Sequence, residues 1–269
     1  MRGGTAVAVV VVSVAAALAI AMSRHGQNQG ARCGRGFVPR RARCVPESGE
    51  CPAPLTLSRR GCEAPDTRVA VPASAIALGP SDWEIEGTDP PRMIEVQAFR
   101  LDAFEVTRGR WADATGEEAA RAASGMTRDE AEAFCAARDG RLPTEDEWIV
   151  AAASAASPPP RYPWGDTGVV CRRAAWGLLA GPCAVAADGP DTVGAHPDGD
   201  SPLGLRDLAG NVAEWVARDP TQRSGSGIGI AKGGSWQSGL ATDLRIWARL
   251  ELRPDAHDPR VGLRCAYPP

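Results

Sequence analysis

Eight cysteines constrain the fold of this 269-residue chain more than any other feature of its sequence. Their number is even, and none lies in the Cys-x-x-Cys spacing that is typical of zinc sites. Paired disulfides persist in oxidising compartments. The sequence therefore predicts an exported protein, located in the periplasm, in the cell envelope or outside the cell, and held together in part by disulfides.

An apolar run near the N-terminus agrees with export, but it fits both a cleaved signal peptide and a membrane anchor. Arg2 precedes an uncharged stretch from Ala6 to Met22, which is longer than a typical signal-peptide core and shorter than a comfortable membrane span. Ala19-Ile20-Ala21 fits a cleavage site, so residues 1–22 are predicted to be either a signal peptide or a membrane anchor that tethers the protein through residues 6–22. The arginines after the run oppose an outward-facing anchor, because positive charge favours the cytoplasmic side; they are Arg24, Arg32, Arg35, Arg40, Arg41 and Arg43. We give the cysteines more weight than these charges.

Residues 23–68 form a cysteine-rich segment with too few apolar side chains to build a core of its own. Its four cysteines, which allow three pairings, are Cys33, Cys44, Cys51 and Cys62. The segment is either a binding module or a stapled linker that holds the main domain off the membrane or cell wall, and we favour the linker. Residues 69–269 remain for one domain with a substantial core.

The net charge of the chain argues against nucleic-acid binding, and its composition predicts a loop-rich fold. The formal net charge is -3, so the sequence gives no reason to expect nucleic-acid binding. The chain has 30 Gly and 23 Pro, which predicts a loop-rich fold, and its 8 Trp provide large side chains for packing. Residues 161–205 show little periodicity, and a loop of that length needs a staple. Cys171 and Cys183 are close enough in sequence to provide one.

Hydrophobic periodicity and capping residues predict short elements between Val69 and Ala266. Helices are expected to begin after Thr107, after Thr127, where Glu130 completes a capping box, and after Thr144. Strands are expected from the alternation of apolar residues, over Val69–Val71, Ser74–Leu78, Met93–Phe99, Val212–Val216, Arg245–Arg249 and Gly262–Ala266.

Several long strings occur in a fixed order along the domain. They are DAFEVT at 102–107, AEAFCAARDGRLPTEDEW at 131–148, YPWG at 162–165, GLRDLAGNVAEW at 204–215, KGGSW at 232–236 and GLRCA at 262–266. In these strings the chain resembles the formylglycine-generating enzyme family, also called the sulfatase-modifying factor family, over about Val69 to Tyr267. The resemblance implies an α+β fold that is related to C-type lectins, has little regular secondary structure and is stapled by disulfides.

The resemblance also implies a calcium ion and a disulfide. The calcium ligands would be the side chains of Asp207 and Glu214 and the carbonyl groups of Gly210 and Val212, and calcium prefers several oxygen ligands. The alternative for this string is a solvated turn with a carboxylate that caps a helix. The disulfide would join Cys135 to Cys265; the alternative is two buried free thiols.

The reactive centre of the family is altered in this chain. The enzymes that it resembles oxidise a cysteine of a client sulfatase, using oxygen and copper(I) held by two cysteines. Ser238 and Asp243 stand at those two positions. Copper(I) prefers soft thiolates, so a hydroxyl and a carboxylate are poor hosts for it. Some relatives use a histidine-rich iron site instead, but this domain has only His196 and His257.

These observations predict a non-catalytic, calcium-stabilised domain that binds a peptide or a small polar ligand in the former active-site cleft. The cleft residues would be Ser235, Trp236, Ser238, Asp243, Arg245 and Arg249. One alternative is a metal-dependent oxidoreductase of the formylglycine-generating type with an altered active site. The other is a structural module of the cell envelope.

Overall fold

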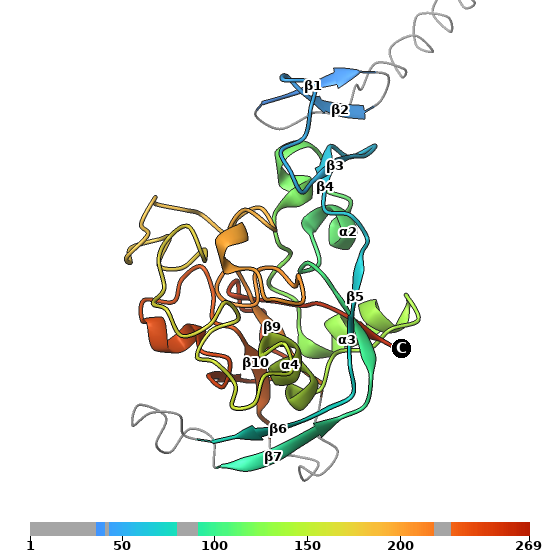
Figure 1. Ribbon diagram of the computed structural model, residues 1–269. Coiled ribbons are helices and arrows are strands. Elements are labelled where there is room, and N and C mark those ends of the chain that lie inside the picture. Colours follow the sequence, from blue (N-terminus) through green and yellow to red (C-terminus); the bar gives the residue numbers. More distant parts are fainter. Residues whose placement is uncertain (1–35, 41–42, 80–90, 218–226) are drawn as a thin grey trace, which may run out of the picture.

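The described part of the chain consists of short strands joined by long loops (Figure 1). The computed structural model describes residues 36–40, 43–79, 91–217 and 227–269. The predicted leader, residues 1–22, and Cys33 lie outside them. Within the described residues, no helix is long and apolar enough to cross a membrane.

The largest sheet has four strands in the order β11-β10-β9-β12. Its central strands β9 (Ala213–Trp215) and β10 (Gly229–Lys232) are antiparallel, and β11 (Arg249–Leu252) continues the antiparallel pattern at one edge. At the other edge, β12 (Val261–Gly262) pairs with β9 in parallel. The GNVAEW string therefore supplies a strand at the centre of the domain.

A second sheet joins the two ends of the domain. Its order is β13-β8-β5, with β8 (Phe99–Asp102) between β5 (Arg68–Val71) and β13 (Ala266–Tyr267). Both outer strands pair with β8 in the antiparallel direction. Three two-stranded hairpins complete the sheets, formed by β1 (Phe37–Arg40) with β2 (Arg43–Pro46), β3 (Thr56–Leu57) with β4 (Cys62–Glu63), and β6 (Ser74–Leu78) with β7 (Arg92–Val96).

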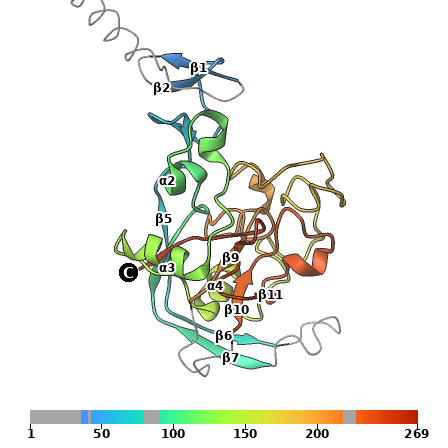
Figure 2. The same cartoon turned by 180° about the vertical axis from the view of Figure 1, so that it is seen from behind.

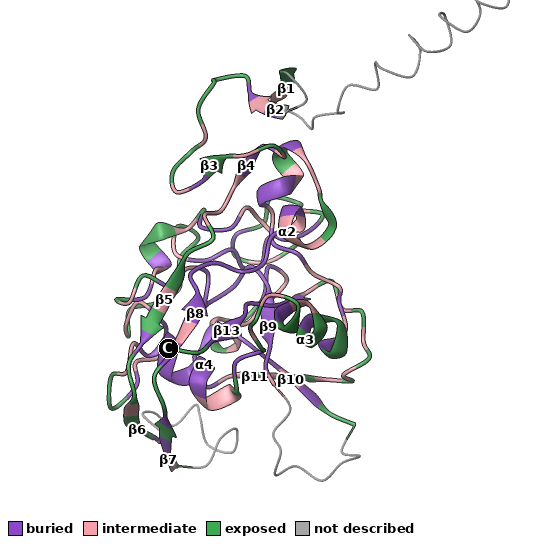
Figure 3. Cartoon of the chain, turned by 90° about the vertical axis from the view of Figure 1, so that its right-hand side faces the viewer, coloured by how far each residue is buried: buried purple, intermediate pink, exposed green. Residues whose placement is uncertain are grey.

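The helices begin where the capping residues predict. Thr107, Thr127 and Thr144 each accept a main-chain hydrogen bond in the first turn of a helix, and the last two complete capping boxes. The helices are α2 (Arg108–Ala112), α3 (Arg128–Ala136) and α4 (Glu145–Ala152), and the short 3-10 turns are η2 (Gly116–Ala120), η3 (Pro197–Gly199) and η4 (Ala241–Leu244). Figure 3 shows α4 buried along most of its length, whereas α3 exposes its outer face.

Three predicted strands were wrong in their bounds. Met93–Phe99 is interrupted at residues 97–98, because β7 pairs with β6 and β8 pairs with β5. Residues 245–248 form a turn closed by a hydrogen bond from Ala248 N to Arg245 O, and the apolar residues that suggested a strand are core side chains. Gly262–Ala266 is divided between β12 and β13, because the chain leaves one sheet and enters the other there.

Three disulfides staple the described residues. They are Cys51–Cys62, Cys135–Cys265 and Cys171–Cys183, so both predicted pairs of the main domain are formed. Every cysteine that the structure describes is disulfide-bonded. The Cys171–Cys183 bond closes part of the long irregular stretch before η3, which is otherwise held by hydrogen bonds between loops.

The second half of the cysteine-rich segment packs against the main domain (Figures 1 and 2). Leu55 and Cys62 are buried in a cluster that includes Phe104. Arg60 donates hydrogen bonds of 3.0 and 2.6 Å to Asp113 Oδ1, at the end of α2. Residues 55–63 are therefore fixed to the domain by apolar contacts, by this ion pair and by the Cys51–Cys62 staple.

Candidate functional site

A cluster of four buried charged side chains lies at the centre of the domain. Glu105, Asp207, Glu214 and Arg264 are 0%, 7%, 1% and 0% exposed, respectively. They come from the strings DAFEVT, GLRDLAGNVAEW and GLRCA, which are far apart in the sequence. The burial of Asp207 and Glu214 contradicts the alternative of a solvated turn.

Glu214 and Arg264 form a buried ion pair. Glu214 lies on β9, and Arg264 lies in the segment between β12 and β13. Arg264 Nη2 lies 2.6 Å from Glu214 Oε1, and its Nε lies 2.8 Å from both carboxylate oxygens. Trp148, on α4, donates its indole N–H to Glu214 Oε2 at 2.7 Å. The GNVAEW, GLRCA and RLPTEDEW strings therefore meet through one carboxylate.

Glu105 and Asp207 complete the cluster. Glu105 accepts hydrogen bonds from Val212 N at 3.0 Å and from Asn211 Nδ2 at 2.5 Å. Asp207 Oδ2 accepts from Gly194 N at 2.5 Å. Burial raises the pKa of Glu105 well above its usual range, and the nearby carboxylates of Asp207 and Glu214 raise it further. Burial also raises the pKa of Asp207.

The charge of this cluster fits a divalent cation. The raised pKa of Glu105 favours its protonated form, so the carboxylates of Asp207 and Glu214 and the one guanidinium carry a net charge of about -1. The carbonyl oxygens of Gly210 and Val212, the other two predicted ligands, accept no hydrogen bond from the residues that the structure describes. No group of three or more His, Cys, Asp or Glu side chains within the described residues could hold a metal by itself. Carbonyl ligands are therefore essential to the predicted calcium site, which stays a prediction.

The six predicted cleft residues do not line one open cleft. Ser235, Trp236 and Arg245 are buried, at 2%, 4% and 6% exposure. Trp236 packs in a cluster with Trp176 and Leu244, and its indole N–H donates to the carbonyl of Pro259 at 3.1 Å. Arg249 lies on β11 and pairs with Glu145 of α4. Arg249 is exposed, and Ser238 and Asp243 are partly exposed.

The segment from Ser235 to Asp243 forms tight turns. Ser238 Oγ accepts from Ser235 N at 3.0 Å, and Ser238 N donates to Ser235 O at 2.9 Å. Gly234 has a φ of 70°, and a Cβ there would approach Asp243 O to 2.8 Å, so the GGS string must retain this glycine. Burial raises the pKa of Asp243. The Ser238 hydroxyl is thus used to close its own turn.

The two histidines of the domain have separate partners. His196 Nε2 lies 3.3 Å from Asp191 Oδ2. His257 Nδ1 lies 2.8 Å from the carbonyl of Gly125. Neither ring contacts Ser238 or Asp243 through a hydrogen bond within the described residues.

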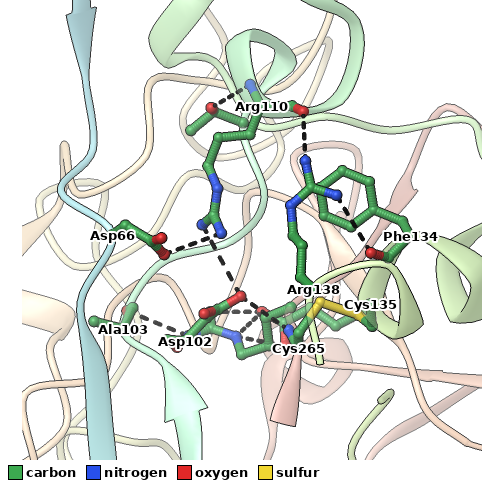
Figure 4. A network of polar contacts seen from close by, with 11 residues as sticks. Asp66, Asp102, Ala103, Arg110, Phe134, Cys135, Arg138 and Cys265 are labelled. Atoms are coloured by element: carbon green, nitrogen blue, oxygen red, sulfur yellow. Dashed lines mark hydrogen bonds and ion pairs between the residues drawn. A yellow bond between two sulfur atoms is a disulfide. The ribbon is translucent and has the colours of Figure 1, made fainter. Parts of the chain in front are cut away.

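The Cys135–Cys265 bond lies beside a second buried carboxylate (Figure 4). Asp102, which is 1% exposed, accepts from Cys265 N at 3.2 Å, and Arg110 Nη1 lies 4.0 Å from the same oxygen. Arg110 also pairs with Asp66 at 3.1 Å. The C-terminal segment is therefore held by a covalent bond, by the β13–β8 pairing and by this polar network.

Sequence reasoning missed two members of the central cluster and one cavity. Glu105 and Arg264 were part of quoted strings but received no role, although each is a charged residue between apolar neighbours, Phe104-Glu105-Val106 and Leu263-Arg264-Cys265. The missed cavity, of about 710 Å³, lies between β7, the first turn of α4 and the β9–β11 sheet. Of the six predicted cleft residues, Arg249 lines it.

Comparisons with known proteins agree with this arrangement. A family model described as "Sulfatase-modifying factor enzyme 1-like domain" matches residues 56–268. A mouse (Mus musculus) protein described as "Inactive C-alpha-formylglycine-generating enzyme 2" is 35% identical over 145 residues, which cover 51% of this chain and 46% of that protein. The "Formylglycine-generating enzyme" of Thermomonospora curvata is 30% identical over 151 residues, which cover 48% and 50%. The chain thus spans about half the length of the curated relatives it matches.

A solved structure supports the fold. "Treponema denticola variable protein 1" superposes with a TM-score of 0.60 at 20% identity, covering 75% of this chain and 95% of that one. At that identity the likeness concerns the fold alone. Together with the mixed sheets, few helices and three disulfides, it confirms the predicted α+β fold of the formylglycine-generating enzyme type. Because the family model matches most of the chain, including every string that builds the central cluster, this protein belongs to the family of sulfatase-modifying factor enzyme 1-like domains.

Proposed function

We propose that this chain is a non-catalytic member of its family, an exported domain that binds a peptide or a small polar ligand at the former catalytic segment. One observation carries the proposal: Ser238 and Asp243 stand where the family resemblance places the two copper-binding cysteines. No other described cysteine can replace them, because each is in a disulfide. The mouse relative, whose name states that it is inactive, supports the same conclusion.

The surface around Ser238 and Asp243 supports a binding role. Gly239 and Leu240, which lie between them, are exposed, and Leu240 is 66% exposed. The turns around Ser235 keep this segment in a defined shape, which reduces the entropy cost of binding. The Ser238 Oγ accepts from Ser235 N, but its O–H can still donate. This O–H, the Asp243 carboxylate and main-chain groups are suited to hydrogen bonds with a polar ligand. The three disulfides support export, since such bonds persist in oxidising compartments.

Copper binding tests the loss of catalysis. We expect the purified protein to show no stoichiometric copper(I) binding against a copper(I) chelator. We also expect no oxygen uptake above the blank with a cysteine-containing sulfatase peptide, because hard oxygen ligands hold copper(I) poorly. The matched variant Ser238→Cys/Asp243→Cys should gain one copper(I) per chain. Turnover by the unaltered protein would overturn the proposal.

We further propose that a calcium ion binds the central cluster through Asp207, Glu214 and the carbonyls of Gly210 and Val212. The net negative charge of the buried cluster supports this, because an uncompensated buried charge is costly. Carboxylates that bind a metal are commonly hydrogen-bonded by other groups as well. The bonds from Arg264 and Trp148 to Glu214 therefore agree with a ligand role.

Chelation tests this ion site. We expect EDTA to lower the melting temperature by about 5–10 °C, which corresponds to losing an ion present at about 100 times its Kd. Added calcium should restore the value, whereas Asp207→Ala should remove the calcium response. If calcium and EDTA give the same melting temperature for the unaltered protein, the assignment of Asp207 and Glu214 is wrong.

A further inference from the structure

One edge of β7 is not used by the hairpin that it forms. β7 pairs with β6 in a register that places Ala77 opposite Met93 and Ala75 opposite Glu95. Ala77 N donates to Ser157 Oγ at 3.2 Å, so the main-chain groups of the Ala77–Met93 pair point away from each other. Antiparallel pairs alternate between bonded and non-bonded. The main-chain groups of Glu95, two residues on, therefore also point to the outer edge of β7.

These outward groups have no partner within the part of the chain that the structure describes. No hydrogen bond outside the hairpin involves the N–H or C=O of Met93 or Glu95. The two residues are exposed, and Met93 is 61% exposed. An edge with unpaired N–H and C=O groups is a template for another strand.

The cavity of about 710 Å³ lies directly beside this edge. The consecutive residues Glu95, Val96 and Gln97 all line it. Glu95 and Val96 are the last two residues of β7, and Gln97 follows the strand. Because successive residues of a strand point to opposite faces, a cavity that contacts both Glu95 and Val96 borders the backbone edge of the strand rather than one of its faces. Its volume lies in the range of sites that enclose small ligands or short segments.

The opposite wall of the cavity is a row of ion pairs on the first turn of α4. Each acidic residue of that turn pairs with an arginine outside α4, at 2.5–2.6 Å. The pairs are Glu145–Arg249, Asp146–Arg92 and Glu147–Arg141. In total the lining contains four arginines and four acidic residues. Because these charges balance, the lining suits a ligand without net charge.

Apolar side chains complete the lining. Val96, Val216 and Ile230 contribute aliphatic surface, and Ile228 adds an exposed edge to it. A ligand that satisfies all these features has alternating main-chain donors and acceptors, aliphatic side chains and no net charge. An extended peptide has this chemistry, and strand addition to an open edge is a known mode of peptide recognition.

We propose that the outer edge of β7 binds an extended, net-neutral peptide segment as an added strand, with its aliphatic side chains in the cavity between β7 and α4. This site is separate from the Ser238–Asp243 segment. It uses main-chain groups of Met93 and Glu95 together with the cavity walls. The proposal does not depend on the proposed function, since neither copper chemistry nor calcium enters it.

Nuclear magnetic resonance with a defined probe tests the proposal on the full domain. The probe is the peptide acetyl-Thr-Val-Thr-Val-Thr-amide, and its matched control is the same peptide with alternate amides N-methylated. We expect the amide signals of Met93 and Glu95 to shift on titration and their hydrogen exchange to slow. The N-methylated peptide should bind at least tenfold more weakly, because it cannot donate to the strand edge.

Proline variants test whether the main-chain N–H groups at the outer edge of β7 bind the peptide. Glu95→Pro removes one outward N–H and should weaken binding at least tenfold, and proline is tolerated at strand edges. Ala75→Pro makes the same change at the outer edge of β6 and should leave the affinity within twofold. If Glu95→Pro does not fold, the comparison of the two peptides on the unaltered protein still tests the proposal.

Three results would overturn the proposal. The first is equal binding of the two peptides, or no binding of either at millimolar concentration. The second is slow exchange of Met93 and Glu95 amides before any peptide is added, which would mean that another segment or another copy already covers the edge. The third is that the shifts appear at Ser238–Asp243 instead, which would place peptide binding at the other site.

Discussion

Replacing both Cys135 and Cys265 by alanine is expected to lower the free energy of unfolding by about 5 kcal/mol. The bond joins residues 130 positions apart, and in the chain-entropy model the stabilisation grows with the length of the closed loop. Both cysteines are fully buried, and the bond ties α3 to the segment before β13. Urea unfolding under non-reducing conditions measures the loss.

The Cys171–Cys183 bond provides the matched control. It closes a loop with a separation of 12 residues, so removing both cysteines should cost only about 3 kcal/mol in the same model. Cys171 is also exposed, so its replacement leaves less of a buried cavity. If the two double variants lose equal stability, loop length does not determine the contribution of these bonds.

Arg264→Met is expected to lower the free energy of unfolding by about 3–5 kcal/mol, the usual cost of removing one partner of a buried ion pair. The substitution would leave Glu105, Asp207 and Glu214 buried without the guanidinium. It would also remove the hydrogen bond from Arg264 Nη2 to the carbonyl of Arg206, at 2.7 Å. Denaturant unfolding in calcium-containing buffer measures the effect.

Two further variants show how much of the loss in stability comes from leaving a buried charge without its partner. Arg260→Met breaks a partly exposed pair with Asp258 and should cost less than about 1 kcal/mol. The double variant Arg264→Met/Glu214→Gln should recover part of the loss, because it no longer leaves Glu214 charged without its partner. If the double variant loses at least as much free energy of unfolding as Arg264→Met alone, packing around Arg264, rather than charge, sets the cost.

The elements that could be predicted from the sequence are those whose signals are local. Thr127 and Glu130, or Thr144 and Glu147, define the start of a helix within four residues, and both capping boxes are formed. The strand bounds near the C-terminus depend instead on partners far away in the sequence. Apolar residues around Ile246 looked like a strand because the sequence does not distinguish a strand from a turn whose side chains are buried.

The site could be predicted only where its residues lie close together in one string. Asp207 and Glu214 are seven positions apart and were recognised together. Glu105 and Arg264 join them through long-range pairing, in which Val106 N donates to Leu263 O, and no local pattern reports such pairing. Trp236 was assigned to a cleft from its place in the GGSW string, whereas the fold buries its ring and uses its N–H internally.

The position of β12 and β13 determines when the domain can finish folding. Residues 261–267 complete both sheets, β12 beside β9 and β13 beside β8, and Cys265 closes the longest disulfide loop among the described residues. A nascent chain therefore lacks these pairings until residues 261–267 have been synthesised. Such late, long-range closure keeps the emerging polypeptide unfolded for longer.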